Sequence, residues 1–290
     1  MLTYRRFRLG RLKTLGLLRE LESTPGPGVS VFLVPGTSPD YVKDVLGKAL
    51  PAADVPEDVA GIATGSPTGA GIFWGPSRKL LVQPPFPLTE QFITSGFDTG
   101  PLRVLLEHRF MVALVLVRLG AFAVGVWQGE SLVTSKTGTG LVHGRHRKGG
   151  SSQRRFERRR EKQADEFLER VCGHVRQHLE PHAPALDYIA YGGARTTIRS
   201  LQQRCPFLRR FEGRTLPPLL DIPRPRRSVL EEAITSLMSS HVAEWREDTP
   251  AEIDTRQPEA YHSRSSPAGM ATPPPDAGGS RMANRSTEEE

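Results

Sequence analysis

A Gly-Gly-x-x-Gln segment is the stretch of this 290-residue chain whose residue types and spacing could support catalysis. Gly149 and Gly150 lack side chains, so their backbone can approach a substrate closely and adopt φ values closed to other residues. Gln153 follows after two serines, and its amide can both donate and accept a hydrogen bond. Together with its own backbone N–H, this amide can orient a water molecule or stabilise a developing oxyanion. The same residues also describe an ordinary flexible loop, so the surrounding sequence has to decide between the two.

The segment lies within a run of positive charge. From His143 to Lys162, nine Lys and Arg residues stand against two Glu, which gives a local charge of +7. Because the whole chain also carries +7, the residues outside this run sum to zero. Positive charge concentrated on one loop and one helix start indicates a polyanion partner, RNA or DNA.

A long helix is expected from about Ser152 to His182. At 100° per residue, one stripe is apolar and the opposite side is cationic. The stripe holds Phe156, Ala164, Phe167, Leu168, Val171, Val175 and Leu179, and the cationic side holds Arg155, Arg158, Arg159 and Lys162. Arginine near a helix N-terminus opposes the helix dipole, so a chain that accepts this cost is expected to bind phosphates. The simpler alternative is a charged face that is only solvated.

The remaining elements predict a mixed α/β sheet with helices on its faces, preceded by a small α/β domain. The N-terminal α/β domain, 1–105, is expected to contain helices at 9–23, 40–50 and 56–66, a strand at 29–34 and a hairpin at 71–84. The second domain, 106–245, is expected to contain strands within 110–128 and at 130–136, 186–191 and 216–222, a helix at 194–204 and a final helix ending near Trp245. Residues 246–290 carry five basic and nine acidic residues among many Pro, Ser and Gly, which predicts a disordered tail.

Hydropathy and cysteine usage favour a cytoplasmic protein. The most apolar segment, Phe110 to Trp127, has Arg118 in its middle and reads as two buried strands joined at Leu119-Gly120, not as a membrane span. The basic N-terminus lacks the apolar core of a signal peptide. Cys172 and Cys205 show no pairing motif, so we expect two unpaired thiols in a reducing compartment.

The order of strand meander, basic Gly-Gly…Gln loop, amphipathic helix, strand and helix resembles the central catalytic domain of the eukaryotic and archaeal peptide release factor superfamily. More narrowly, the run R-H-R-K-G-G-S-S-Q-R-R-F-E-R-R-R-E-K-Q is similar to bacterial VLRF-type peptidyl-tRNA hydrolases. Those enzymes are relatives of the release factor-like enzyme of eukaryotic ribosome-associated quality control. The resemblance is strongest over 110–222. Release factors proper have Gly-Gly-Gln without a gap, whereas Ser151 and Ser152 intervene here, a spacer that the VLRF branch tolerates.

This resemblance implies an RNase H-like central fold and hydrolysis of the ester that joins a stalled nascent peptide to tRNA. By motif match, Gly149 and Gly150 are the flexible pair and Gln153 is the catalytic glutamine, with Ser152 beside it. The expected partners are the large ribosomal subunit, through its rRNA, and peptidyl-tRNA. The chain is expected to act as a monomer, without a membrane, a metal or an organic cofactor. The residues expected to meet RNA phosphates are Arg145, Arg147, Lys148, Arg154, Arg155, Arg158, Arg159 and Lys162.

Three other readings compete with the hydrolase. A non-enzymatic ribosome- or RNA-binding factor could use the same basic loop only for docking. A metal nuclease needs clustered carboxylates to hold Mg²⁺, and the strands within 110–128 contain no Asp or Glu. His174, His178 and His182 step by four and could suggest a metal site, but Pro181 interrupts the series and no acidic residue completes it.

Overall fold

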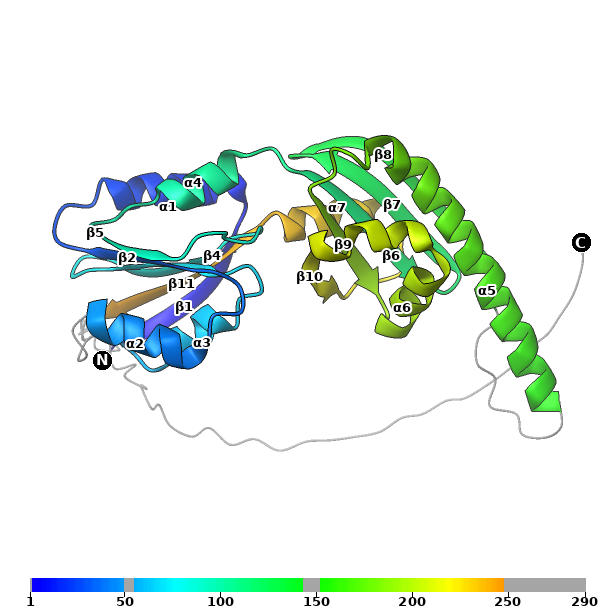
Figure 1. The fold of residues 1–290 in the computed structure, drawn as a ribbon, viewed down its shortest axis with the longest axis horizontal. Helices are drawn as coiled ribbons and strands as arrows, with labels where there is room; N and C mark the ends of the chain where they lie inside the picture. The colour runs from blue at the N-terminus through cyan, green and yellow to red at the C-terminus, as the bar shows by residue number, and fades with distance from the viewer. Residues whose placement is uncertain (1, 50–54, 143–151, 248–290) are drawn as a thin grey trace, which may run out of the picture. The chain divides into compact units, whose positions relative to one another are not determined.

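The computed structural model describes residues 2–49, 55–142 and 152–247, and its strands form two sheets. The tail predicted for 246–290 lies outside the described residues from position 248 onward. Both sheets carry helices, as the sequence predicted for an α/β protein, and Figure 1 shows how the elements are arranged in each.

The first sheet has six strands, and each pairs with antiparallel neighbours. Their order in space is β1 (Leu2–Leu9), β11 (Ser240–Glu247), β4 (Lys79–Gln83), β3 (Ala70–Trp74), β2 (Val29–Leu33) and β5 (Phe92–Ser95). Alternate residues of a strand point to opposite faces, so Phe32 and Phe73 contact one helical layer and Val31 and Ile72 the other. The first layer is α1 (Arg11–Glu22) with α4 (Gly100–Glu107), and the second is α2 (Pro39–Ala49) with α3 (Asp58–Thr64) (Figure 1).

The second sheet confirms the predicted mixed sheet and has the RNase H-like strand order. In space the strands run β8 (Ser131–Thr139), β7 (Ala121–Gln128), β6 (Met111–Arg118), β9 (Tyr188–Gly193) and β10 (Thr215–Leu220). The first three in sequence form an antiparallel meander, whereas β9 is parallel to β6 and β10 is parallel to β9. Numbered along the chain within this sheet, the order is 3-2-1-4-5.

Helices cover both faces of the second sheet, which explains why its central strands are apolar throughout. One face packs against α5 (Ser152–Leu179), α6 (Arg195–Arg204) and the 3₁₀ segment η3 (Pro206–Arg214). The other face packs against α7 (Arg227–Leu237). The segment Phe110 to Trp127 therefore forms two buried strands, as predicted, with Gly120 at φ +93° in the turn between them. Within the three described ranges, no helix is long and apolar enough to cross a membrane.

The prediction of a final helix ending near Trp245 is wrong. The helix α7 ends at Leu237, and residues 240–247 form β11, which pairs with β1 and β4 in the first sheet. Val242 and Trp245 have helical spacing, but Trp245 stacks on Tyr4 at 5.4 Å between ring centroids and lies at the same distance from Trp74. Burial in the middle of a sheet therefore overrides the local pattern. The division of the chain at residues 105 and 245 remains a prediction.

The prediction of two unpaired thiols is also wrong. Cys172 of α5 and Cys205 at the end of α6 form a disulfide with their Cα atoms 5.5 Å apart. The two cysteines are 33 positions apart in sequence and meet because α5 and α6 lie side by side on the same face of the second sheet. The argument for a reducing compartment from unpaired thiols therefore no longer holds.

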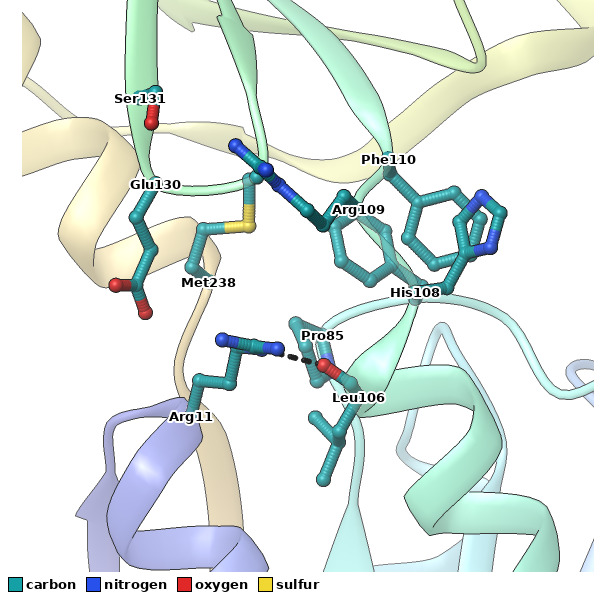
Figure 2. Close-up of a pocket in the computed structure, with 11 residues that line it drawn as sticks. Arg11, Pro85, Leu106, His108, Arg109, Phe110, Glu130, Ser131 and Met238 are labelled. Carbon is teal, nitrogen blue, oxygen red and sulfur yellow. Dashed lines mark hydrogen bonds between the residues drawn. The ribbon is translucent and has the colours of Figure 1, made fainter.

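A cavity of about 310 Å³ lies where the connection from α4 to β6 passes the β7–β8 turn. Arg11, His108 and Arg109 contribute polar side chains to it (Figure 2). Its apolar wall includes Phe110, whose ring lies 4.3 Å from that of Phe86. The Arg11 Nε atom donates to the Leu106 carbonyl at 2.6 Å, which fixes the start of α1 against the end of α4.

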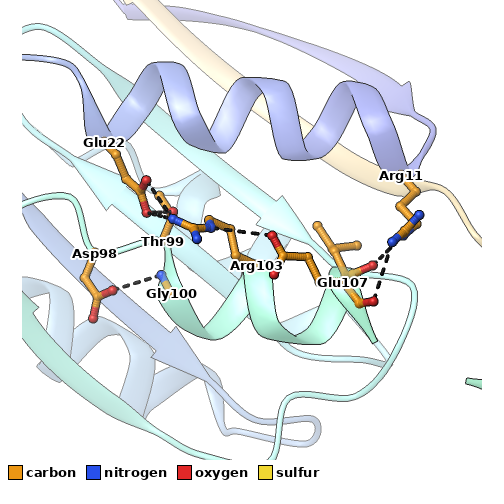
Figure 3. A network of polar contacts seen from close by, with 8 residues as sticks. Arg11, Glu22, Asp98, Thr99, Gly100, Arg103 and Glu107 are labelled. Carbon is orange, nitrogen blue, oxygen red and sulfur yellow. Dashed lines mark hydrogen bonds and ion pairs between the residues drawn. The ribbon is translucent and has the colours of Figure 1, made fainter. Parts of the chain in front are cut away.

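A polar network joins α1 to α4 within the first helical layer of the first sheet (Figure 3). Glu22 at the end of α1 accepts hydrogen bonds from the Thr99 hydroxyl and from Arg103, whose Nη1 lies 3.0 Å from the carboxylate. Asp98 accepts the Gly100 backbone N–H at 2.9 Å, so a carboxylate satisfies a free donor at the start of α4. These contacts stabilise the helical layer.

Candidate functional site

The predicted catalytic segment ends at the first turn of α5. The helix begins at Ser152, so the backbone of Gln153 lies one residue inside it, and two serines separate it from the predicted flexible pair. Gly149 and Gly150 lie outside the described residues, and so do Arg145, Arg147 and Lys148. The backbone of Arg154 is helical, but the structure does not describe the side chains of residues 152–154.

The four predicted cations of the described helix are all exposed. Arg155, Arg158, Arg159 and Lys162 face solvent, as the helical periodicity predicted. Lys162 lies 3.9 Å from Glu166, one turn further along α5. The first turn of α5 holds no acidic residue, so its positive charges add to the positive end of the helix dipole. Within the described part of α5, this N-terminal surface therefore has the most favourable electrostatic interaction with an anion.

The apolar stripe anchors only the second half of α5. Phe167, Leu168, Val171, Val175 and Leu179 are buried against the second sheet. No residue before Phe167 in the described helix is buried, and Figure 1 shows the N-terminal half of α5 extending beyond the strands. Residues 152–162, which precede the contact of α5 with α6 at Asp165, therefore project by roughly 16 Å at ~1.5 Å per residue.

Phe156 does not belong to the buried stripe, which corrects the sequence interpretation. Its side chain is 63% exposed, because the sheet does not reach this part of α5. Helical periodicity gives the direction of a side chain but not whether another element lies opposite. The sequence held a second signal, since Phe156 is surrounded by Arg154, Arg155, Arg158 and Arg159. An exposed aromatic ring among arginines is a surface on which nucleic-acid bases stack.

The glycines before the basic segment serve close packing. Gly138 and Gly140 lie at the end of β8, where a Cβ on Gly140 would come within 2.6 Å of the Phe167 ring. A side chain on Gly138 would collide with the ring of Phe122. Gly140 thus lets the chain after β8 approach the anchored half of α5, and Gly138 makes room for the Phe122 ring of β7.

The three histidines near the end of α5 have separate surroundings. His174 stacks on Phe122 with 5.1 Å between ring centroids. The His178 Nδ1 atom lies 2.9 Å from the Thr134 hydroxyl of β8, and burial, followed by the charges of His174 and Lys136, lowers the pKa of His178. His182 lies in a short 3₁₀ turn after the helix. Across the described ranges, no three His, Cys, Asp or Glu side chains gather in a metal-binding arrangement.

The cavity of Figure 2 is separate from α5. None of the residues that line it belongs to α5, and none is among the residues predicted from the Gly-Gly-x-x-Gln segment. The N-terminal half of α5 instead presents exposed cations to solvent.

The second half of the chain is similar to known proteins. Residues 111–243 match the family described as "Actinobacteria/chloroflexi VLRF1 release factor". Peptide chain release factor subunit 1 of Archaeoglobus fulgidus is 31% identical over 119 residues, which cover 40% of this chain and 29% of the relative. The Methanopyrus kandleri protein of the same name is 33% identical over 103 residues, covering 34% and 25%. The chain thus spans about a quarter to a third of the length of these relatives.

Two solved structures match this chain with TM-scores below 0.5. An archaeal translation termination factor, aRF1, has a TM-score of 0.37 at 20% identity and covers 79% of this chain and 70% of its own. The structure titled "Vms1 mitochondrial localization core" has a TM-score of 0.38 at 14% identity and covers 59% and 74%.

The region that matches the family model contains the five strands of the second sheet and the helix α5. Over residues 111–243, the chain is thus similar to VLRF-type members of the peptide release factor superfamily.

Proposed function

We propose that this protein is a ribosome-associated peptidyl-tRNA hydrolase, which releases stalled nascent chains from tRNA on the large ribosomal subunit. The observation that carries the proposal is the position of Gln153. Its backbone lies in the first turn of a helix whose N-terminal part projects by roughly 16 Å, and two serines separate it from the Gly-Gly pair. The relatives' name, peptide chain release factor, supports the same reaction class.

The proposed chemistry is ester hydrolysis. The Gln153 amide and its backbone N–H would orient a water molecule on the ester carbonyl that joins the peptide to the terminal ribose of tRNA. The water oxygen forms a bond to the carbonyl carbon, the bond to the ribose oxygen breaks, and the proton passes to that oxygen. The peptide leaves with a carboxyl end. Gly149 and Gly150 would let the backbone approach the ester, with Ser152 beside Gln153.

The exposed cations would hold the helix end on RNA. Arg155, Arg158, Arg159 and Lys162 are exposed on the projecting half of α5, where phosphates can reach them from several sides. Arg145, Arg147, Lys148 and Arg154 are proposed to extend this contact. The exposed ring of Phe156 lies one helical turn after Gln153 and would stack on a base, which would fix the rotation of the helix about its axis.

The proposed partners are the rRNA of the large subunit and peptidyl-tRNA, and the proposed place of action is the cytoplasm. The chain would act there as a monomer. The reaction requires water and the residues of this chain, with no metal or organic cofactor in any step.

The test measures binding and release separately. Gln153→Ala is expected to bind large subunits as the unchanged protein does but to lose release of labelled peptide from stalled subunit–peptidyl-tRNA complexes. A neutralised helix, Arg155→Gln with Arg158→Gln and Arg159→Gln, is expected to lose both together at moderate salt.

The competing function, a non-enzymatic ribosome- or RNA-binding factor, fits the same exposed cations. It predicts salt-sensitive binding but no peptide release by the unchanged protein. Normal release by Gln153→Ala would contradict the proposed role of Gln153.

A further inference from the structure

A second arginine-rich surface lies on α6 and on η3, which follows it. Residues 195–214 hold six Arg and one acidic residue, Glu212, a local charge of +5. The net charge of the whole chain does not reveal this cluster, because the 45 residues from Arg246 onward carry a net charge of −4. The whole surface lies outside the Gly-Gly-x-x-Gln segment.

The arginines of this surface differ in what they contact. Arg204 pairs with Asp165 of α5, Arg214 donates to the Leu186 carbonyl at 2.8 Å, and Arg210 lies 5.6 Å from the centre of the Phe207 ring. These three arginines have structural contacts. The other three, Arg195, Arg199 and Arg209, are exposed and have no acidic partner among the described residues.

Helix geometry places two of the unpaired arginines together. Arg195 and Arg199 are one turn apart on α6, and Gln203 follows one turn later on the same side. The opposite side of α6, with Thr197, Ile198 and Leu201, is buried. The first turn of α6 holds no acidic residue, so Arg195 lies at the positive end of the helix dipole, as the arginines of α5 do. This arrangement raises the affinity of the surface for an anion.

The surface is attached firmly to the helix that carries Gln153. The Cys172–Cys205 disulfide joins α5 to the junction between α6 and η3. The Arg204–Asp165 pair makes a second connection, and the two helices pack side by side on the same sheet face. A partner that holds α6 and η3 therefore also restricts where the projecting end of α5 can lie. Two contacts in a fixed arrangement bind more tightly than either alone, since the second forms at a high effective concentration.

We infer that Arg195, Arg199 and Arg209 form a second RNA-docking surface, which binds the phosphate backbone of ribosomal RNA while the end of α5 reaches the ester. Guanidinium groups match phosphate geometry with two parallel hydrogen bonds, and Gln203 adds an amide that can contact a base or ribose. The inference rests on the proposed association with the large subunit but does not depend on the catalytic role of Gln153.

The test uses the full chain and purified vacant bacterial large ribosomal subunits. In the variant Arg195→Gln with Arg199→Gln and Arg209→Gln, affinity is expected to fall on the order of tenfold at physiological salt. The slope of log affinity against log salt is expected to decrease by about 2, at about 0.7 to 0.9 per lost phosphate contact. Hydroxyl-radical footprinting should show loss of one set of rRNA protections, distinct from the set lost when the α5 arginines are neutralised.

A matched control removes the same charge elsewhere. Lys13 and Arg19 of α1 and Lys43 of α2 are exposed, so changing all three to Gln also lowers the net charge by three. The control is expected to keep nearly the full affinity and salt slope. Circular dichroism and thermal melting establish that each variant is folded.

Three results would overturn the inference. The first is binding by the α6–η3 variant equal to that of the unchanged protein, and the second is an equal loss in the control. The third is a loss of affinity with every rRNA protection intact, which would assign the surface to a protein partner. Normal release by Gln153→Ala, together with a lost footprint in the α6–η3 variant, would instead contradict the catalytic role of Gln153 and leave this surface supported.

Discussion

The Cys172–Cys205 disulfide can be removed by changing both cysteines to alanine or by reduction. Either change is expected to lower the free energy of unfolding substantially. The bond closes a loop across a separation of 33 residues. Loop-closure entropy for that length corresponds to roughly 3.7 kcal/mol at 25 °C, an upper value because the reduced unfolded chain retains some structure. For a folded unit of this size, each kcal/mol moves the melting temperature by about 2–4 °C. The expected decrease in melting temperature is thus roughly 7–15 °C.

The assay compares melting of the unchanged protein and the double variant, each with and without a thiol reductant. The reductant should lower the melting temperature of the unchanged protein to that of the variant and leave the variant unaffected. Peptide mapping without reduction should recover the two cysteines in one linked species. Equal melting temperatures in all four samples, with no linked species, would refute the reasoning. Peptide release well below the melting temperature should survive reduction, because Phe167 and its apolar neighbours still anchor α5.

Two further predictions concern side chains of α5. Phe156→Ala should change the free energy of unfolding by less than about 0.5 kcal/mol yet weaken binding to large subunits, whereas Phe167→Ala should cost about 3–5 kcal/mol in chemical denaturation. If Phe156→Ala binds subunits normally, its ring has no docking role. Burial, His174 and Lys136 hold the pKa of His178 below its usual 6.5, so the folded state prefers the neutral ring. The stability that this preference contributes is present above pH 6.5 and is lost as pH falls through the lower folded pKa, so His178→Gln should flatten the fall in stability from about pH 7 to about pH 5. An unchanged pH profile in that variant would contradict this assignment.

Local sequence patterns predicted the second sheet and its long helix well. The apolar run from Phe110 to Trp127 gave two strands, and the charged–apolar periodicity after Ser152 gave α5 to within a few residues of its observed end at Leu179. Both signals are local, because a buried strand or an amphipathic helix shows its surroundings in its own residues. The position of Gln153 at the start of α5 followed from the same periodicity.

What local patterns missed depends on contacts between distant parts of the chain. The strand β11 pairs with β1, whose residues lie more than 230 positions earlier, and the spacing of Val242 and Trp245 by itself favours a helix. The disulfide likewise depends on how α5 and α6 pack. Phe156 has the right helical phase for burial, but no strand lies opposite it. The sequence shows the arginines of α6 but not which of them contact other residues and which are exposed, because this depends on how α6 packs against its neighbours.

The most direct test of the central proposal is the rate of peptide release by Gln153→Ala at saturating concentrations of stalled large-subunit complexes. Removal of a group that orients water or stabilises an oxyanion is expected to reduce this rate by on the order of a hundredfold to a thousandfold. Affinity for the vacant large subunit should stay within about twofold, because the arginines that bind phosphate remain. Release by Gln153→Ala at the rate of the unchanged protein would contradict the account.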